Sequence, residues 1–92
     1  MPGTYRVEFT PAALRQLKKL PRNILKKVAH AIDNLESNPR PDGTKKLVAG
    51  DNLYRIRVGD YRIVYQINNK ELIILFVRVR YRKDVYGYGS TG

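Results

Sequence analysis

Three arginines, Arg55, Arg57 and Arg62, lie close together in the middle of the chain, and their spacing brings them onto one surface. Gly59-Asp60 is a two-residue turn signal between alternating apolar segments, which predicts a tight hairpin in which Arg57 pairs with Arg62. Alternation along the strands then places all three guanidinium groups on the same face. Because a guanidinium binds a phosphate through two parallel hydrogen bonds, the cluster indicates a platform for phosphate anions.

The same cluster has a second interpretation, because arginines are also ordinary residues on the solvated face of a strand. Like charges directly opposite each other destabilise a sheet, however, and a locally unfavourable arrangement is typical of functional sites. We therefore favour a phosphate-binding role for this hairpin.

A second basic stretch, residues 78–86, interleaves cations with tyrosines. This pattern suits contact with phosphates together with stacking on nucleobases, so Arg78 and Arg80 are candidate RNA-binding residues. Whether these two share the face of the hairpin arginines depends on the turn at Asn68-Asn69, because loops of even and odd length place them on opposite faces of the sheet. The sequence does not decide on which face Arg78 and Arg80 lie.

Composition argues against several other kinds of site. The chain has no cysteine and a single histidine, His30, so it offers neither a thiolate nucleophile nor a set of zinc ligands. The eight Asp and Glu residues show no close pairing at catalytic spacing, and the serines lack a His and Asp arrangement. We expect no metal and no small-molecule cofactor.

The chain is short and strongly basic: its 92 residues include 18 Lys and Arg against 8 Asp and Glu, a formal net charge of +10. Such an excess attracts polyanions, which are nucleic acid, an acidic protein or an anionic membrane surface. The longest apolar run, residues 72–77, is far too short to cross a bilayer, so we expect a cytoplasmic protein without a membrane partner. The length predicts one domain over residues 1–86 and a glycine-rich, flexible tail over residues 87–92.

A small set of elements must position the arginines. Period-two alternation over residues 4–9 predicts a strand. Thr10 as N-cap and Pro11 as first helical residue predict a short helix, which Pro21 interrupts. Further predicted elements are a helix over residues 22–37, a hairpin over residues 53–67, and an interior strand, covered on both sides, over residues 71–80.

This order of strand, helix, helix and three strands is typical of an α+β domain. We expect the two N-terminal helices to pack on one face of a small, mainly antiparallel four-stranded sheet. The opposite face, which carries the arginines, is then left for function.

Four segments together match one known family. They are Tyr5-Arg6-Val7-Glu8-Phe9, Leu17-Lys18-Lys19-Leu20-Pro21, residues 54–65 and Arg82-Lys83-Asp84-Val85-Tyr86. Over about residues 4–86 the chain resembles the RelE/ParE superfamily of bacterial and archaeal type II toxins. The hairpin motif is shared by the ribonuclease and gyrase-poisoning branches, whereas the last segment is similar to the RelE branch.

The resemblance to RelE toxins implies a ribosome-dependent endoribonuclease that cleaves translated mRNA in the A site, without a metal and with the RNA 2′-hydroxyl as nucleophile. It also implies a cognate acidic antitoxin that blocks the activity. By the same resemblance, the active-site residues are Arg55 and Arg57 as basic residues, Arg62 as the arginine that holds the scissile phosphate, and Arg82 and Tyr86 as a C-terminal catalytic pair.

Two alternatives stay open. A ParE-like poison of DNA gyrase uses the same scaffold without nuclease activity, and a non-catalytic RNA- or ribosome-binding module needs only the basic surface. The general base is also open, because relatives often place a lysine near the positions of Arg55 and Arg57. A guanidinium, with a pKa above about 12, does not readily release a proton.

Overall fold

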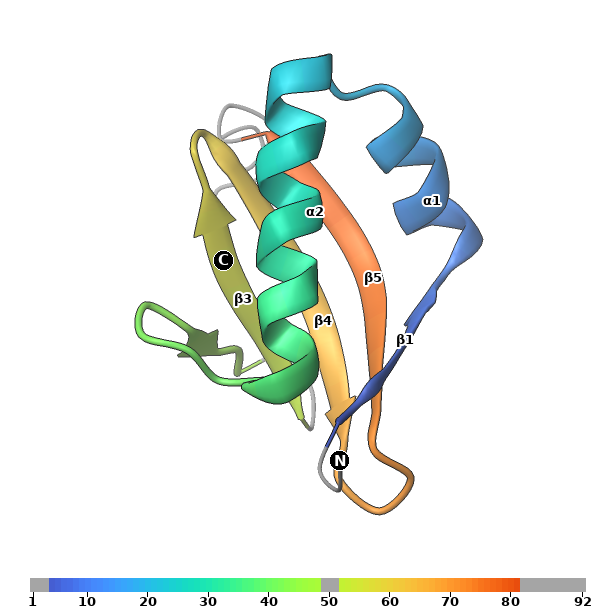
Figure 1. The fold of residues 1–92 in the computed structure, drawn as a ribbon, viewed down its shortest axis with the longest axis vertical. Helices are drawn as coiled ribbons and strands as arrows, with labels where there is room; N and C mark the ends of the chain where they lie inside the picture. The colour runs from blue at the N-terminus through green and yellow to red at the C-terminus, as the bar shows by residue number, and fades with distance from the viewer. Residues whose placement is uncertain (1–3, 49–51, 82–92) are drawn as a thin grey trace.

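A computed structural model of the chain describes residues 4–48 and 52–81. Two helices lie on one face of a five-stranded sheet (Figure 1). The helices are α1 (Pro11–Lys18) and α2 (Arg22–Ser37), and the strands are β1 (Arg6–Phe9), β2 (Lys45–Lys46), β3 (Leu53–Val58), β4 (Tyr61–Asn68) and β5 (Ile73–Tyr81). The expected flexible tail over residues 87–92 lies outside the described residues, as do Arg82 and Tyr86.

The sheet has the strand order β1-β5-β4-β3-β2, with β1 parallel to β5 and the other neighbours antiparallel. The α+β class and the mainly antiparallel sheet are therefore confirmed. The expected number of four strands is wrong by one, because the two-residue strand β2 pairs with the edge of β3. Two lysines in a turn-rich segment carry no alternating pattern, so periodicity gives no sign of β2.

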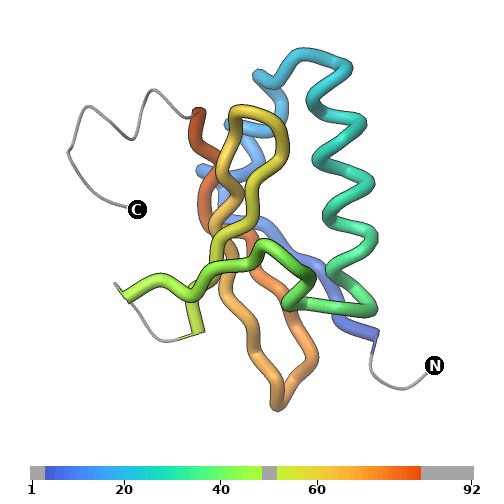
Figure 2. Tube along the Cα trace, turned by 90° about the vertical axis from the view of Figure 1, so that its left-hand side faces the viewer, coloured from blue at the N-terminus to red at the C-terminus, as the bar shows by residue number. Residues whose placement is uncertain are grey.

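Local capping sets where α1 begins. The Thr10 hydroxyl accepts a hydrogen bond from the Ala13 amide at 3.1 Å, and Pro11 occupies the first helical turn, as predicted. After the interruption at Pro21, α2 lies to one side of the strands (Figure 2). Neither described helix has the length and apolar sequence needed to cross a membrane.

The core lies between the helical layer and the sheet. Its helix side is formed by Ala13, Leu17, Val28 and Leu35, and its sheet side is led by Ile63, Tyr65, Ile67, Ile74 and Phe76. Full burial of one large apolar side chain stabilises a fold by about 1.5–3 kcal/mol. These contacts decide which side of each strand is turned away from the helices.

The β3–β4 hairpin has the predicted register. Arg57 pairs with Arg62, and Ile56 pairs with Ile63, across the predicted turn. Gly59 in that turn has a φ of +60°, which glycine adopts without steric cost. Because the two isoleucines are buried beneath the helices, the arginines beside them point to the helix-free face.

Strand β5 lies inside the sheet, between β1 and β4, as predicted. Its Ile74 and Phe76 side chains are fully buried on the helix side. On the other side, Ile73 and Leu75 are only half-buried, so the expectation of cover on both faces is wrong. The physical reason is that both described helices pack on the same face.

A β-bulge interrupts the pairing of β4 with β5. Tyr65 pairs with Phe76, but the preceding residue of β4, Val64, pairs with Arg78. Val77 is therefore an extra residue on β5. Because of it, each later residue of β5 faces the opposite side of the sheet from the one it would face in an uninterrupted strand.

The bulge decides where the second group of arginines points. In an uninterrupted strand after the connection of residues 69–72, Arg78 and Arg80 would face the helices. The extra residue turns both of them to the helix-free face and buries Val79 in their place.

Helix α1 and its cap hold the bulge in position. The Thr10 hydroxyl donates to the Val77 carbonyl oxygen at 2.9 Å, and Gln16 Oε1 accepts from the Val79 amide at 2.7 Å. A bulge disrupts the local ladder, and a buried backbone group left without a partner costs about 1–3 kcal/mol. These two bonds therefore fix the part of β5 that carries Arg78 and Arg80.

Removal of the Gln16 carboxamide tests this link. Gln16→Ala leaves the part-buried Val79 amide without its acceptor, so we expect the free energy of unfolding to fall by about 1–3 kcal/mol and hydrogen exchange at Val79 to accelerate. Urea denaturation and NMR-detected exchange measure the two effects. Arg15→Ala, at the exposed neighbouring position, is the control and should change stability by less than about 0.5 kcal/mol. Equal stability of the two variants contradicts the link.

Candidate nucleic-acid interface

Strands β3, β4 and β5 carry five arginines on the helix-free side of the sheet, which we call the arginine face: Arg55, Arg57, Arg62, Arg78 and Arg80. Three of them form a row, because Arg57 of β3 pairs with Arg62 of β4, which pairs with Arg80 of β5. Neighbouring strands are about 4.8 Å apart, so the row presents three cations over roughly 10 Å. The structure thereby brings both predicted arginine groups together.

A second row crosses the sheet beside the first. It runs from Lys45 of β2 through Arg55 of β3 and Val64 of β4 to Arg78 of β5. Val64 thus sets an apolar side chain between two cations. Cations around an apolar surface suit a nucleotide chain, whose phosphates need charge and whose bases need contact area.

The surroundings of Arg55 disfavour its positive charge. Burial, followed by the positive charges of Arg62 and Arg57, lowers the pKa of Arg55 below the usual arginine value. Its Nε is buried and has no hydrogen-bond partner in the described part of the chain. A bound anion would relieve the repulsion and give the unpaired donor an acceptor.

Three members of the arginine face lack an acidic partner within residues 4–48 and 52–81. These are Arg55, Arg57 and Arg78, which form no ion pair there. By contrast, Arg6 and Glu8 on β1 lie 3.3 Å apart and neutralise each other. The uncompensated charge creates a positive field that draws anions toward the arginine face.

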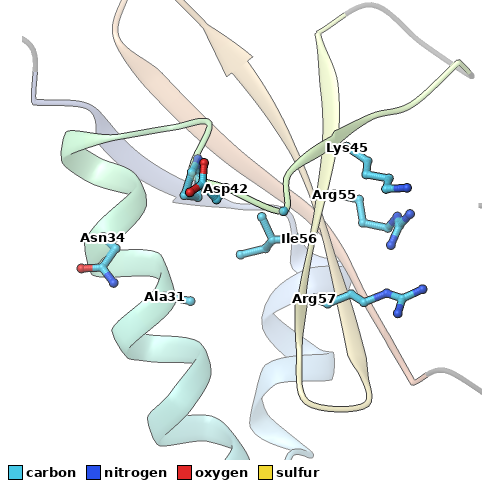
Figure 3. A pocket seen from close by; sticks show the side chains of 9 residues that line it. Ala31, Asn34, Asp42, Lys45, Arg55, Ile56 and Arg57 are labelled. Atoms are coloured by element: carbon cyan, nitrogen blue, oxygen red, sulfur yellow. The ribbon is translucent and has the colours of Figure 1, made fainter.

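A groove of about 450 Å³ lies between the edge of β3, helix α2 and the loop after α2, and its lining includes Asn34, Asp42 and Lys45. Lys45, Arg55 and Arg57 point to one side of β3, whereas Ile56 points toward α2 (Figure 3). Sequence reasoning missed Lys45. In the sequence, Lys45 is only one basic residue in the loop between α2 and the hairpin. Its place beside Arg55 depends on the pairing of β2 with β3, which the sequence does not indicate.

Two tyrosines of the sheet contact the loop between α2 and β2. These contacts hold the loop in place and so position Lys45 at its end. Tyr65 Oη donates to the Pro39 carbonyl oxygen at 2.7 Å. The Arg40 guanidinium lies 5.2 Å from the centre of the Tyr54 ring, a cation–π contact. Burial raises the pKa of Tyr65, so its hydroxyl keeps the proton that it donates.

Next to the arginine face, the same side of the sheet carries half-buried aliphatic side chains, which we call the apolar patch: Leu53, Ile73 and Leu75. Leu53 and Leu75 lie on either side of Gln66 of β4. The helix-free surface therefore has a cationic part and an apolar part.

The remaining candidates do not join this cluster in the described structure. Arg82 and Tyr86 lie outside the described residues, so their roles stay predictions. His30 is exposed on α2, in the helical layer. Among residues 4–48 and 52–81, no three His, Asp or Glu side chains come together as metal ligands would.

Tyr65→Phe tests whether the loop depends on the buried hydroxyl. The Pro39 carbonyl oxygen loses its donor, so we expect the free energy of unfolding to fall by about 1–2 kcal/mol, and trypsin to cut faster after Lys45. Tyr5→Phe is the control, because its hydroxyl donates to the exposed Asn69 at 2.8 Å. If trypsin cuts Tyr65→Phe no faster than the control, other contacts hold the loop.

The chain matches the family model of the ParE toxin of type II toxin-antitoxin system, parDE, over residues 7–86. Toxin RelE3 of Methanocaldococcus jannaschii is 37% identical over 87 residues, which cover 90% of this chain and 97% of that relative. Toxin RelG of Mycobacterium tuberculosis is 35% identical over 85 residues, which cover 89% of this chain and 95% of the relative.

Solved structures share the fold. The archaeal RelE-RelB complex from Pyrococcus horikoshii OT3 contains a chain that aligns with a TM-score of 0.78 and 32% identity, over 86% of this chain and 96% of that one. The RelB-RelE antitoxin-toxin complex from Methanococcus jannaschii gives a TM-score of 0.72 and 33% identity, over 90% and 99%. By family model, sequence identity and fold, the chain belongs to the RelE/ParE superfamily of type II toxin-antitoxin toxins.

Proposed function

We propose that this toxin is a ribosome-dependent endoribonuclease that cleaves translated mRNA in the A site. The observation that carries the proposal is the row of Arg57, Arg62 and Arg80, with Arg55 beside it, on the side of the sheet that the described helices leave open. Strands hold these side chains at fixed spacing, so they can grip a nucleic-acid backbone at defined points. Similarity to relatives that are named as RelE toxins supports assignment of this chain to the RelE branch.

The reaction that fits such a site needs charge and position from the protein. The RNA 2′-hydroxyl attacks its own 3′-phosphate, the bond from phosphorus to the 5′-oxygen of the next nucleotide breaks, and the products are a cyclic phosphate and a 5′-hydroxyl. Negative charge builds on the phosphoryl oxygens during the attack. Guanidinium groups fixed around the phosphate stabilise that charge, which is usually the largest contribution to catalysis.

In this proposal, each arginine has a role that follows from its place in the sheet. Arg62 binds the scissile phosphate, since it occupies the middle of the row with a cation on either side. Arg55 and Arg57 hold the RNA from β3, and Arg78 and Arg80 hold it from β5.

Arg82 and Tyr86 complete the proposed catalytic set through the family resemblance. The last described residue, Tyr81, pairs with Tyr61, directly beside the Arg62 and Arg80 pair. Arg82 would add charge at the phosphate, and Tyr86 would stack on a base or relay a proton.

Arg62→Ala is the central activity test. We expect wild-type protein to cut mRNA on translating ribosomes, and Arg62→Ala to cut at least about 10²-fold more slowly, because one preorganised donor to the charge of the transition state is lost. Arg62→Lys should recover only part of the rate, since an ammonium lacks the two-pronged geometry. Primer extension on ribosome-bound mRNA measures the rates. Arg6→Ala removes the same charge from β1 and should cut at a near wild-type rate.

Three results would contradict the proposal in different ways. Wild-type protein that leaves ribosome-bound mRNA intact, as inert as Arg62→Ala, removes the nuclease function. Gyrase-linked DNA breaks that are unaffected by Tyr86→Phe would favour a ParE-like gyrase poison, the second candidate in view of the matching family model. Salt-sensitive RNA binding without growth arrest would indicate a non-catalytic RNA- or ribosome-binding module.

We further propose that an acidic antitoxin covers the helix-free surface. The relatives from Pyrococcus horikoshii and Methanococcus jannaschii were solved as complexes of RelE with RelB. In this chain the apolar patch borders the arginine face, so an acidic amphipathic segment can satisfy both parts at once. The net charge of +10 also favours rapid association with an acidic partner.

Leu75→Gln tests where the antitoxin binds, with the protein encoded beside the toxin gene as the probe. Loss of most of the burial of one leucine, about 1.5–3 kcal/mol, should weaken binding roughly 10- to 100-fold. Isothermal calorimetry measures the Kd. Leu25→Gln is the control, because Leu25 is an exposed leucine on α2, and it should bind with unchanged affinity. Equal weakening by both variants, or by neither, contradicts binding on the helix-free surface.

A further inference from the structure

One amine lies among the guanidinium groups on the described strands of the helix-free side. Lys45 of β2 pairs with Arg55 of β3 and lines the same groove as Arg55 and Arg57. All three side chains extend in the same direction, away from α2 (Figure 3). The neighbouring Lys46 pairs instead with the buried Tyr54, which places Lys46 on the other side of the strand.

RNA cleavage needs a proton donor, and arginine supplies one poorly. The leaving 5′-oxygen departs as an alkoxide unless a proton reaches it, and a guanidinium holds its protons too tightly to provide one. The tyrosines of the adjacent strand ends, Tyr61 and Tyr81, pair with each other on the helix side. An ammonium is a better proton donor than a guanidinium, so Lys45 adds to this surface a chemical property that its arginines lack.

The reach of the side chains allows Lys45 to act on a phosphate held by the arginine row. Lys45 lies two strands away from Arg62 and one row along the sheet, so the two Cα atoms are roughly 12 Å apart. Lys45 is exposed and extends from the same face as the row, so the two long side chains can converge on one phosphodiester.

We propose that Lys45 is the general acid of the cleavage reaction, an inference that rests on the proposed endoribonuclease activity. As the bond from the 2′-oxygen to phosphorus forms and the bond to the 5′-oxygen breaks, a proton passes from the Lys45 ammonium to the 5′-oxygen. The proton of the 2′-hydroxyl leaves to water. The Lys45 amine regains a proton from solvent after the products depart, so the site returns to its starting state.

A leaving group that needs no proton tests this role. Two mRNAs are compared on translating ribosomes, one with the normal bridging 5′-oxygen at the cut site and one with sulfur there, which leaves readily as a thiolate. On the oxygen mRNA, we expect Lys45→Arg and Lys45→Met to cut roughly 10²- to 10⁴-fold more slowly than wild type. On the sulfur mRNA, we expect the loss to shrink to less than about tenfold, because an acid is no longer needed.

The controls separate proton transfer from charge and from folding. Lys46→Met removes the same charge from the other side of β2 and should cut both mRNAs at the wild-type rate. A near wild-type rate for Lys45→Arg on the oxygen mRNA overturns the inference, because charge alone then suffices. An equal loss on both mRNAs overturns it too, whether or not thermal denaturation shows a destabilised variant. If wild-type protein cuts neither mRNA, the endoribonuclease proposal itself fails, and the acid role fails with it.

Discussion

Repulsion between neighbouring arginines is the main constraint that this fold must satisfy. The register of β3, β4 and β5 sets Arg57, Arg62 and Arg80 side by side, although like charges directly opposite each other destabilise a sheet. The fold tolerates this because the other side of the same strands is buried, and each large core side chain contributes about 1.5–3 kcal/mol. A polyanion that relieves the repulsion is therefore bound more tightly and stabilises the fold in turn.

The helical layer positions the side chains of the arginine face, although no helix forms part of that face. Thr10 bonds to the carbonyl oxygen of the extra residue Val77 and Gln16 bonds to the amide of Val79, and these bonds keep Arg78 and Arg80 on the helix-free side. The loop after α2 is held by Tyr65, and it delivers Lys45 to the edge of the sheet. Stability is thus concentrated on one side of the sheet and charge on the other, so that exposed residues of the charged side can vary with little loss of stability.

How far the sequence predicts this arrangement depends on whether local signals suffice. The hairpin register follows from the glycine turn and the alternation on both strands, and it is confirmed. The outward direction of Arg78 and Arg80 could have been inferred from a conflict: the core residues Ile74 and Phe76 also occupy even positions, so an uninterrupted strand would bury two charges. Lys45 had no such signal, because its place depends on pairing across a loop that only the folded sheet anchors.

The role of the arginine face is tested most directly by a structure of the toxin on a ribosome whose mRNA carries a 2′-O-methyl group at the cut site, so that it binds without being cleaved. We expect the mRNA backbone to follow the helix-free side of the sheet, with the scissile phosphate within hydrogen-bond distance of Arg62. An mRNA that lies on the helical layer, or a bound toxin whose arginine face is turned to solvent, would contradict that role.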